Sequence, residues 1–168
     1  MAIREIREYG DDILAKPCKD VKEMTPRLQE LVDDMLETMY EAGGVGLAAP
    51  QVGVLKKIFV VDITEDRNDP HVFVNPKLIE EDGEQEGYEG CLSLPGKSAI
   101  VKRPNHVIVE AFDREMQPFT LECEELMARA VCHELDHLSG IMYVEKMEGE
   151  LVDNEDLVER DAEEEEED

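Results

Sequence analysis

HELDH at residues 133–137 is the stretch from which the organisation of this 168-residue chain can be worked out. Residues four apart in a helix lie on the same face, so His133 and His137 can reach one metal ion. Glu134 is rotated about a quarter turn from His133, where it can contact a water on that ion without being a ligand. The pattern is short enough to occur by chance on a surface helix. Its interpretation therefore depends on the surrounding sequence and on a third ligand.

The flanking residues predict that HELDH lies on a buried helix. The helix is expected to begin near Glu124 and to run to about Leu138, with Ser139-Gly140 as its stop. Apolar side chains spread around most of its circumference: Leu126, Met127, Ala130, Val131, Leu135 and Leu138. Two histidines and a glutamate on such a helix need polar partners, and a metal ion supplies one.

A second amphipathic helix is predicted for residues 26–42. Thr25-Pro26 reads as an N-cap followed by proline at the first helical position, and Leu, Val and Met residues then recur at helical spacing until Gly43-Gly44. The apolar stripe of this helix is expected to lie in the core rather than on a binding surface.

Three stretches are rich in residues that favour β-strands: 57–63, 72–79 and 99–122. The last is broken by Pro104 and by a turn-like segment at 113–118. This order favours antiparallel strands and hairpins over the alternating βαβ pattern of a parallel sheet.

Length and charge predict one domain with an acidic extension. We expect residues 1–148 to form the catalytic domain and residues 149–168 to form an acidic C-terminal tail that is disordered at its end. The formal net charge is −26, and residues 145–168 hold 14 acidic against 2 basic side chains. Such a charge repels phosphate backbones, so direct binding of nucleic acid is not expected.

The sequence also predicts the cellular compartment and the redox state of the cysteines. The first 12 residues carry early charges and no apolar segment of a secretion signal, and the chain has no apolar run long enough to span a membrane. We therefore expect a cytoplasmic protein without membrane association. Its four cysteines, at positions 18, 91, 123 and 132, are expected to be reduced thiols.

The residues alone leave the third ligand open. A metallopeptidase would use an acidic residue downstream of HELDH, such as Glu155 or Glu159, although both lie in a surface-like sequence. A non-catalytic structural zinc site would use Cys123 or Cys132 with the two histidines. Cys91 differs from these, because it stands in EGCLSLPG beside a turn-forming Pro-Gly pair, with no helical or strand pattern that requires a core thiol.

Three motifs in this order and spacing resemble the signature motifs of bacterial-type peptide deformylases. They are GVGLAAPQ at residues 44–51, EGCLS at 89–93 and HELDH at 133–137, and the resemblance spans roughly residues 3–148. This family of hydrolases removes the N-formyl group from the initiator methionine of newly synthesised polypeptides and releases formate. The resemblance implies an α+β fold in which antiparallel β-sheets pack around a central helix carrying the HExxH motif.

The resemblance assigns the metal ligands and the proton shuttle. Cys91, His133 and His137 would hold the ion, with water as the fourth ligand in an open tetrahedral site. The ion expected in the native protein is Fe(II), for which zinc or nickel can substitute. Glu134 would accept the proton of the attacking water and pass it to the departing amine.

The resemblance also implies a substrate site. The Gln51 side-chain amide and the Leu92 backbone N–H would donate to the oxyanion. Four residues would pair with the extended substrate as an added strand: Gly44, Val45, Gly46 and Gly90. Val45 and Leu126 would line the methionine pocket.

A cluster of charged residues is expected to hold the Cys91 loop against the helix. It consists of Glu89, Arg103 and Asp136. Arg129 stands where the family often has a more apolar residue.

The expected partners are N-formylmethionyl nascent polypeptides. Family members often end in a basic helix that helps them dock on the ribosome, whereas the residues after Met147 are mostly acidic here. A transient proximity to the ribosome would therefore need diffusion or a different contact.

Overall fold

The computed structural model describes residues 2–156, and residues 1 and 157–168 lie outside the described part. The described helices are α1 (Pro26–Glu41) and α2 (Glu125–Leu138), with short 3-10 turns at Asp12–Ala15, Ala49–Val52 and Tyr143–Glu145. The described strands are β1 (Gly46–Ala48), β2 (Ile58–Val61), β3 (His71–Asp82), β4 (Gln85–Cys91), β5 (Leu94–Arg103), β6 (His106–Phe112), β7 (Pro118–Glu124) and β8 (Met147–Asp153).

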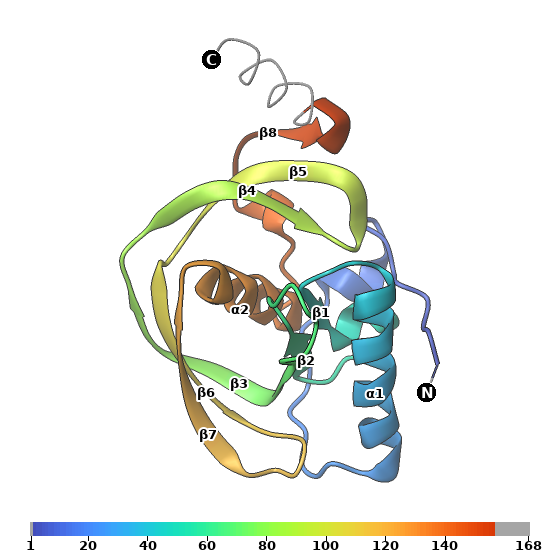
Figure 1. The fold of residues 1–168 in the computed structure, drawn as a ribbon. Coiled ribbons are helices and arrows are strands. Elements are labelled where there is room, and N and C mark those ends of the chain that lie inside the picture. The colour runs from blue at the N-terminus through green and yellow to red at the C-terminus, as the bar shows by residue number, and fades with distance from the viewer. Residues whose placement is uncertain (1, 157–168) are drawn as a thin grey trace.

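Helix α2 lies at the centre of the molecule between two antiparallel sheets (Figure 1). One sheet has five strands in the order β1-β2-β3-β6-β7, and the other has three in the order β4-β5-β8. The predicted fold class, antiparallel sheets packed around the helix that carries HExxH, is confirmed.

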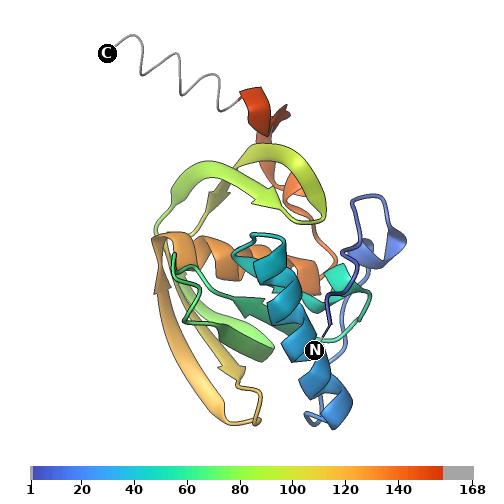
Figure 2. The same ribbon diagram turned by 45° about the vertical axis from the view of Figure 1, so that its right-hand side comes forward.

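The two helices pack on opposite faces of the five-stranded sheet at β2. In Figure 2, α1 crosses in front of α2. Strand β2 is buried along its whole length, and its side chains alternate between two cores. Phe59 and Val61 pack in the cluster that contains the apolar residues of α2, whereas Ile58 and Val60 pack with those of α1. This alternation follows from the pleat of a strand, and it places β2 between the core that contains α1 and the core that contains α2.

Both predicted helices are confirmed, and local contacts explain their ends. The Thr25 hydroxyl accepts a hydrogen bond from the N–H of Leu28 at 3.2 Å, which caps the start of α1. After α2 the chain turns at Gly140, whose φ is +78°. A Cβ there would lie 2.7 Å from the backbone of Ala15, so glycine is required for both conformation and space.

Strand β4 corrects the expectation that EGCLSLPG has no regular structure. Cys91 ends β4, the chain turns at Leu92 and Ser93, and β5 already begins at Leu94. The predicted Pro-Gly turn therefore lies inside a strand instead. The pattern concealed β4 because the residues that alternate inward along it are polar or small rather than apolar.

Strand β8 was not foreseen either, and it crosses the boundary predicted at residue 148. It pairs with β5 in antiparallel register, with Val101 opposite Met147 and Lys97 opposite Asp153. The division into a catalytic domain and an acidic tail stays a prediction, since most of the tail lies outside the described residues. Within residues 2–156, neither helix is long and apolar enough to cross a membrane.

Candidate functional site

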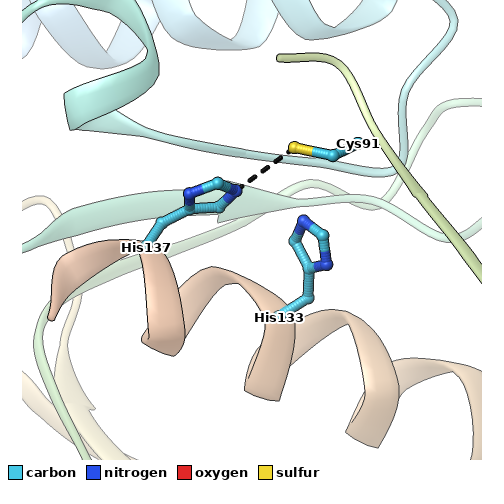
Figure 3. A group of neighbouring side chains, drawn as sticks. All are labelled: Cys91, His133 and His137. Atoms are coloured by element: carbon cyan, nitrogen blue, oxygen red, sulfur yellow. Dashed lines mark hydrogen bonds between the residues drawn. The ribbon is translucent and has the colours of Figure 1, made fainter. Parts of the chain in front are cut away.

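Three potential ligand atoms meet on one side of α2. The side chains of Cys91, His133 and His137 offer atoms that all lie within 4.8 Å of one another, and Figure 3 shows them converging from the end of β4 and from two successive turns of the helix. Cys91 Sγ is 3.3 Å from His137 Nε2, and the two imidazole rings lie 5.0 Å apart at an angle of 70°. One thiol and two imidazoles form a donor set suited to zinc, iron or nickel.

The two histidines have pKa values shifted in opposite directions. Burial disfavours a charged imidazolium at His133, but Cys91 and Glu89 outweigh burial and raise the pKa of His133 well above its usual range. Burial and the neighbouring His133 lower the pKa of His137 well below the usual range. Nδ1 of His137 is buried and has no hydrogen-bond partner among the described residues.

Glu89 orients His133 from behind. One Glu89 carboxylate oxygen contacts Nδ1 of His133, so Nε2 of that ring is turned towards Cys91 and Glu134. Burial raises the pKa of the Glu89 carboxyl, but hydrogen bonds with His133 and Arg103 outweigh it and hold the pKa at about 2. Glu89 is therefore ionised at neutral pH.

The predicted charge cluster is assembled in the structure. Arg103 donates to Glu89 at 2.6 and 3.1 Å and to Asp136 at 2.5 Å, and so joins β4 to α2 through a guanidinium on β5. Arg129 also belongs to this cluster, because it donates to Glu89 at 2.7 Å and to the carbonyl of Val101 at 3.1 Å. The sequence did not reveal this role. The sequence placed Arg129 on the helix that carries HELDH, but no pattern indicated that its partner would be Glu89, 40 residues upstream.

Arg103→Leu is expected to destabilise the metal-loaded protein by about 3–5 kcal/mol. The substitution leaves Glu89 and Asp136 short of a partner in a region where side-chain exposure is only 5% and 15%. Arg114→Leu is the matched control, because Arg114 pairs with the more exposed Asp33 and should lose about 1 kcal/mol or less. Urea unfolding of both variants measures the difference, and equal losses would contradict the assigned importance of the buried cluster.

Glu134 lies beside the three ligand atoms and faces a cavity. Its side chain is buried, and one oxygen, Oε2, has no hydrogen-bond partner among the described residues. Burial raises the pKa of the Glu134 carboxyl to about 7. A carboxyl with that pKa can both accept and release a proton near neutrality, as a general acid-base group must.

The cavity has a volume of about 560 Å³ and lies between the edge strands of the two sheets. Its walls include residues from β1 and the preceding turn, from the β4–β5 hairpin and from α2. All the residues expected to bind substrate are among them: Gly44, Val45, Gly46, Gly90 and Leu126. Leu126 is 48% exposed and borders this cavity, unlike the buried residues in the later turns of its helix.

Gln51 and Leu92 also line this cavity. Gln51 is buried, and its side-chain oxygen accepts a hydrogen bond from the N–H of Ala48 at 2.9 Å. The amide nitrogen consequently faces Ser93 Oγ at 3.0 Å and Cys91 Sγ at 3.5 Å. The fixed orientation points an N–H donor towards the ligand group, which a free loop glutamine would not do.

The alternative third ligands do not join the group. Cys123 and Cys132 are buried free thiols whose pKa values burial raises to about 11, and neither belongs to the cluster of ligand atoms. Glu155 is exposed and does not belong to it among the described residues. Glu159 lies outside the described part of the chain.

Comparison with known proteins identifies the family. Residues 3–151 match the family model described as polypeptide deformylase. The peptide deformylase of Lachnoclostridium phytofermentans is 60% identical over 90% of this chain and 93% of its own length, and that of Agathobacter rectalis is 58% identical over 91% and 95%. The crystal structure of a peptide deformylase from Legionella pneumophila superposes with a TM-score of 0.85 at 43% identity, over 87% of this chain and 86% of that one. This chain therefore belongs to the polypeptide deformylase family.

Proposed function

We propose that the chemistry of this chain is organised around a metal ion held by Cys91, His133 and His137. As a polypeptide deformylase, the chain is a metal-dependent hydrolase that removes the formyl group from the N-terminal methionine of polypeptides. The observation that carries the proposed ligand set is the convergence of one thiol and two imidazoles within 4.8 Å. Beside them lies the Glu134 carboxylate, whose Oε2 has no hydrogen-bond partner among the described residues.

The ion expected in the native protein is Fe(II), with zinc or nickel able to substitute. When bound, such an ion supplies Lewis acidity and makes water nucleophilic at neutral pH. The donor set fits this role, because three protein ligands leave a position open for catalysis.

The chain's own residues would divide the remaining work. Glu134 takes the proton of the attacking water and returns it to the departing amine, from a buried position beside the ligands. The Gln51 amide, held by Ala48, and the Leu92 backbone N–H would donate to the oxyanion that develops on the formyl oxygen when its carbon is attacked. Glu89 keeps His133 in place during turnover.

The substrate would lie as an extended strand between β1 and β4, the two strands that border the cavity from the edges of their sheets. Backbone groups of Gly44, Val45, Gly46 and Gly90 would pair with it, and the methionine side chain would contact Val45 and Leu126. A Cβ on Gly46 would lie 3.1 Å from the Glu134 side chain, so the backbone of β1 passes close to the proposed proton shuttle. The natural substrates would be nascent chains in the cytoplasm.

Metal analysis and a formate assay test the proposed ion. Protein purified without oxygen is expected to contain stoichiometric iron and to release formate from formyl-Met-Ala-Ser. Its activity should decay in air, because a ferrous ion and a thiolate are both oxidisable, and exchange for nickel or zinc should prevent the decay. Equal stability with and without oxygen would contradict Fe(II) as the working ion.

A further inference from the structure

The backbone of residues 44–46 passes close to the side chains of Leu92 and Glu134, two residues to which the proposed mechanism gives a role. A Cβ on Gly44 would lie 2.6 Å from the Leu92 side chain, and one on Gly46 would lie 3.1 Å from that of Glu134. A side chain at either position would be crowded, so little space separates this backbone from Leu92 and Glu134. Any outward displacement would widen the cavity at the place where a substrate strand pairs with it.

Backbone hydrogen bonds hold this segment only in part. The N–H of Gly44 donates to the carbonyl of Met39 at 3.0 Å, and the N–H of Asp62 donates to the carbonyl of Val45 at 2.9 Å. Residues 46–48 then pair with β2, so β1 is an edge strand only three residues long. Short edge strands are weakly held unless something else covers or clamps them.

Arg67 supplies such a clamp. Its Nη1 donates to the carbonyl of Gly44 at 2.6 Å, and among the described residues this is the one side-chain hydrogen bond to residues 42–46. The same nitrogen lies 3.4 Å from the carbonyl of Asp62. The guanidinium also lies over the ring of Tyr40 at 5.8 Å, which fixes its approach from the end of α1.

The loop that carries Arg67 is built to present it. The buried carboxylate of Asp62 accepts hydrogen bonds from the N–H and hydroxyl of Thr64, the N–H of Asp69 and the hydroxyl of Tyr40, at 2.5 to 3.2 Å. Arg67 itself has a φ of +56°, which is costly for a residue with a side chain. The contacts around Asp62 hold the loop in this conformation and so direct the guanidinium at Gly44.

We propose that Arg67 is a positioning residue for substrate binding, which clamps the Gly44 carbonyl and so holds residues 44–46 in the geometry that receives the peptide strand. This inference rests on the proposed function. Because the clamp acts on the substrate-pairing edge and not on the metal ligands, its loss should weaken binding of the peptide more than it slows the chemical step.

A series at position 67 tests the clamp. Arg67→Met keeps an unbranched apolar side chain and removes the guanidinium donors, whereas Arg67→Lys keeps one charged donor group. For formyl-Met-Ala-Ser we expect KM to rise about tenfold in Arg67→Met, equivalent to about 1.4 kcal/mol, with kcat changed by less than about threefold. Arg67→Lys should restore part of the affinity. Arg114→Ala is the matched control, because that arginine fastens the other end of α1 through Gln29 and Asp33 and should leave KM unchanged.

Hydrogen exchange separates a failure of this inference from a failure of the proposed function. The amides of Gly44 and Asp62, which donate to the carbonyls of Met39 and Val45, should exchange about tenfold faster in Arg67→Met than in the wild type, whether or not the protein deformylates peptides. A wild-type KM together with wild-type exchange in Arg67→Met would overturn the clamp and leave the proposed function intact. An equal rise of KM in Arg114→Ala would also overturn it, since the effect would then be a general loss of stability.

Discussion

Glu134→Gln is expected to lower kcat/KM for formyl-Met peptides by about 10²–10⁴-fold while the protein keeps its metal. Glutamine has nearly the shape of glutamate, so it should fit the same buried site beside Gly46. It cannot accept a proton, however, and the loss should therefore appear in kcat. Formate release and metal content, measured on the same preparation, check both parts of this expectation.

The control for Glu134→Gln is a carboxylate removed elsewhere. Glu110→Gln changes an exposed side chain on β6 and should leave both formate release and metal content unchanged. Wild-type turnover in Glu134→Gln with bound metal would contradict the role as proton shuttle. Simultaneous loss of metal and activity would instead make Glu134 part of the metal-binding shell.

The helices could be predicted from the sequence because local signals define each of them: apolar residues at helical spacing and residues that favour helix ends. Pro26 after Thr25 marks the start of α1, and apolar residues at helical spacing continue to its end. Ser139-Gly140 likewise stops α2 where the structure ends it. Strand β2 could be predicted in the same way, because it consists of β-branched and aromatic residues, and β3 begins with a similar run at residues 72–74.

Among the strands that were not predicted, β4 and β8 are defined by their partners rather than by their composition. Strand β4 turns Gln85, Gly87 and Glu89 inward, and only the charge cluster around Arg103 and the nearby Arg129 makes such a pattern tolerable. Strand β8 has as many acidic as apolar residues, three of each. Its pairing with β5 and the packing of Met147 and Leu151 on the small core are long-range effects. Local propensity carries little information about either.

The site shows the same division between local and long-range information. The spacing of His133 and His137 predicts their shared face directly. The approach of Cys91 to them depends on the β4–β5 hairpin, and the residues alone left three kinds of third ligand open. The orientation of the Gln51 amide depends on its hydrogen bonds with Ala48 and Ser93. Composition and spacing did not indicate it, so only the motif resemblance predicted a role for Gln51.

Cys91→Ser is expected to lower metal affinity by more than about 100-fold and to abolish formate release at stoichiometric metal. Loss of a residue that merely supports a ligand typically costs 10–100-fold, so loss of a ligand should exceed that range. A serine hydroxyl is a poorer ligand than a thiolate for iron, zinc or nickel, and its shorter bond would leave the oxygen farther from His137 than the 3.3 Å at which the sulfur lies. Metal analysis after dialysis, with the formate assay alongside, measures both effects.

Cys132→Ser is the matched control, since Cys132 precedes His133 on α2 but its thiol does not belong to the ligand group. It is buried with a pKa raised to about 11, so the substitution should cost some stability and leave the metal in place. Metal lost from Cys132→Ser and kept by Cys91→Ser would contradict the proposed ligand set and favour a closed structural site. Cleavage of internal peptide bonds by a still active Cys91→Ser would instead favour a metallopeptidase with a downstream acidic ligand. The two cysteines approach the same two histidines from different positions, so the pair of variants shows which third ligand the metal requires. It distinguishes Cys91 from a cysteine in a structural site and from a downstream acidic residue.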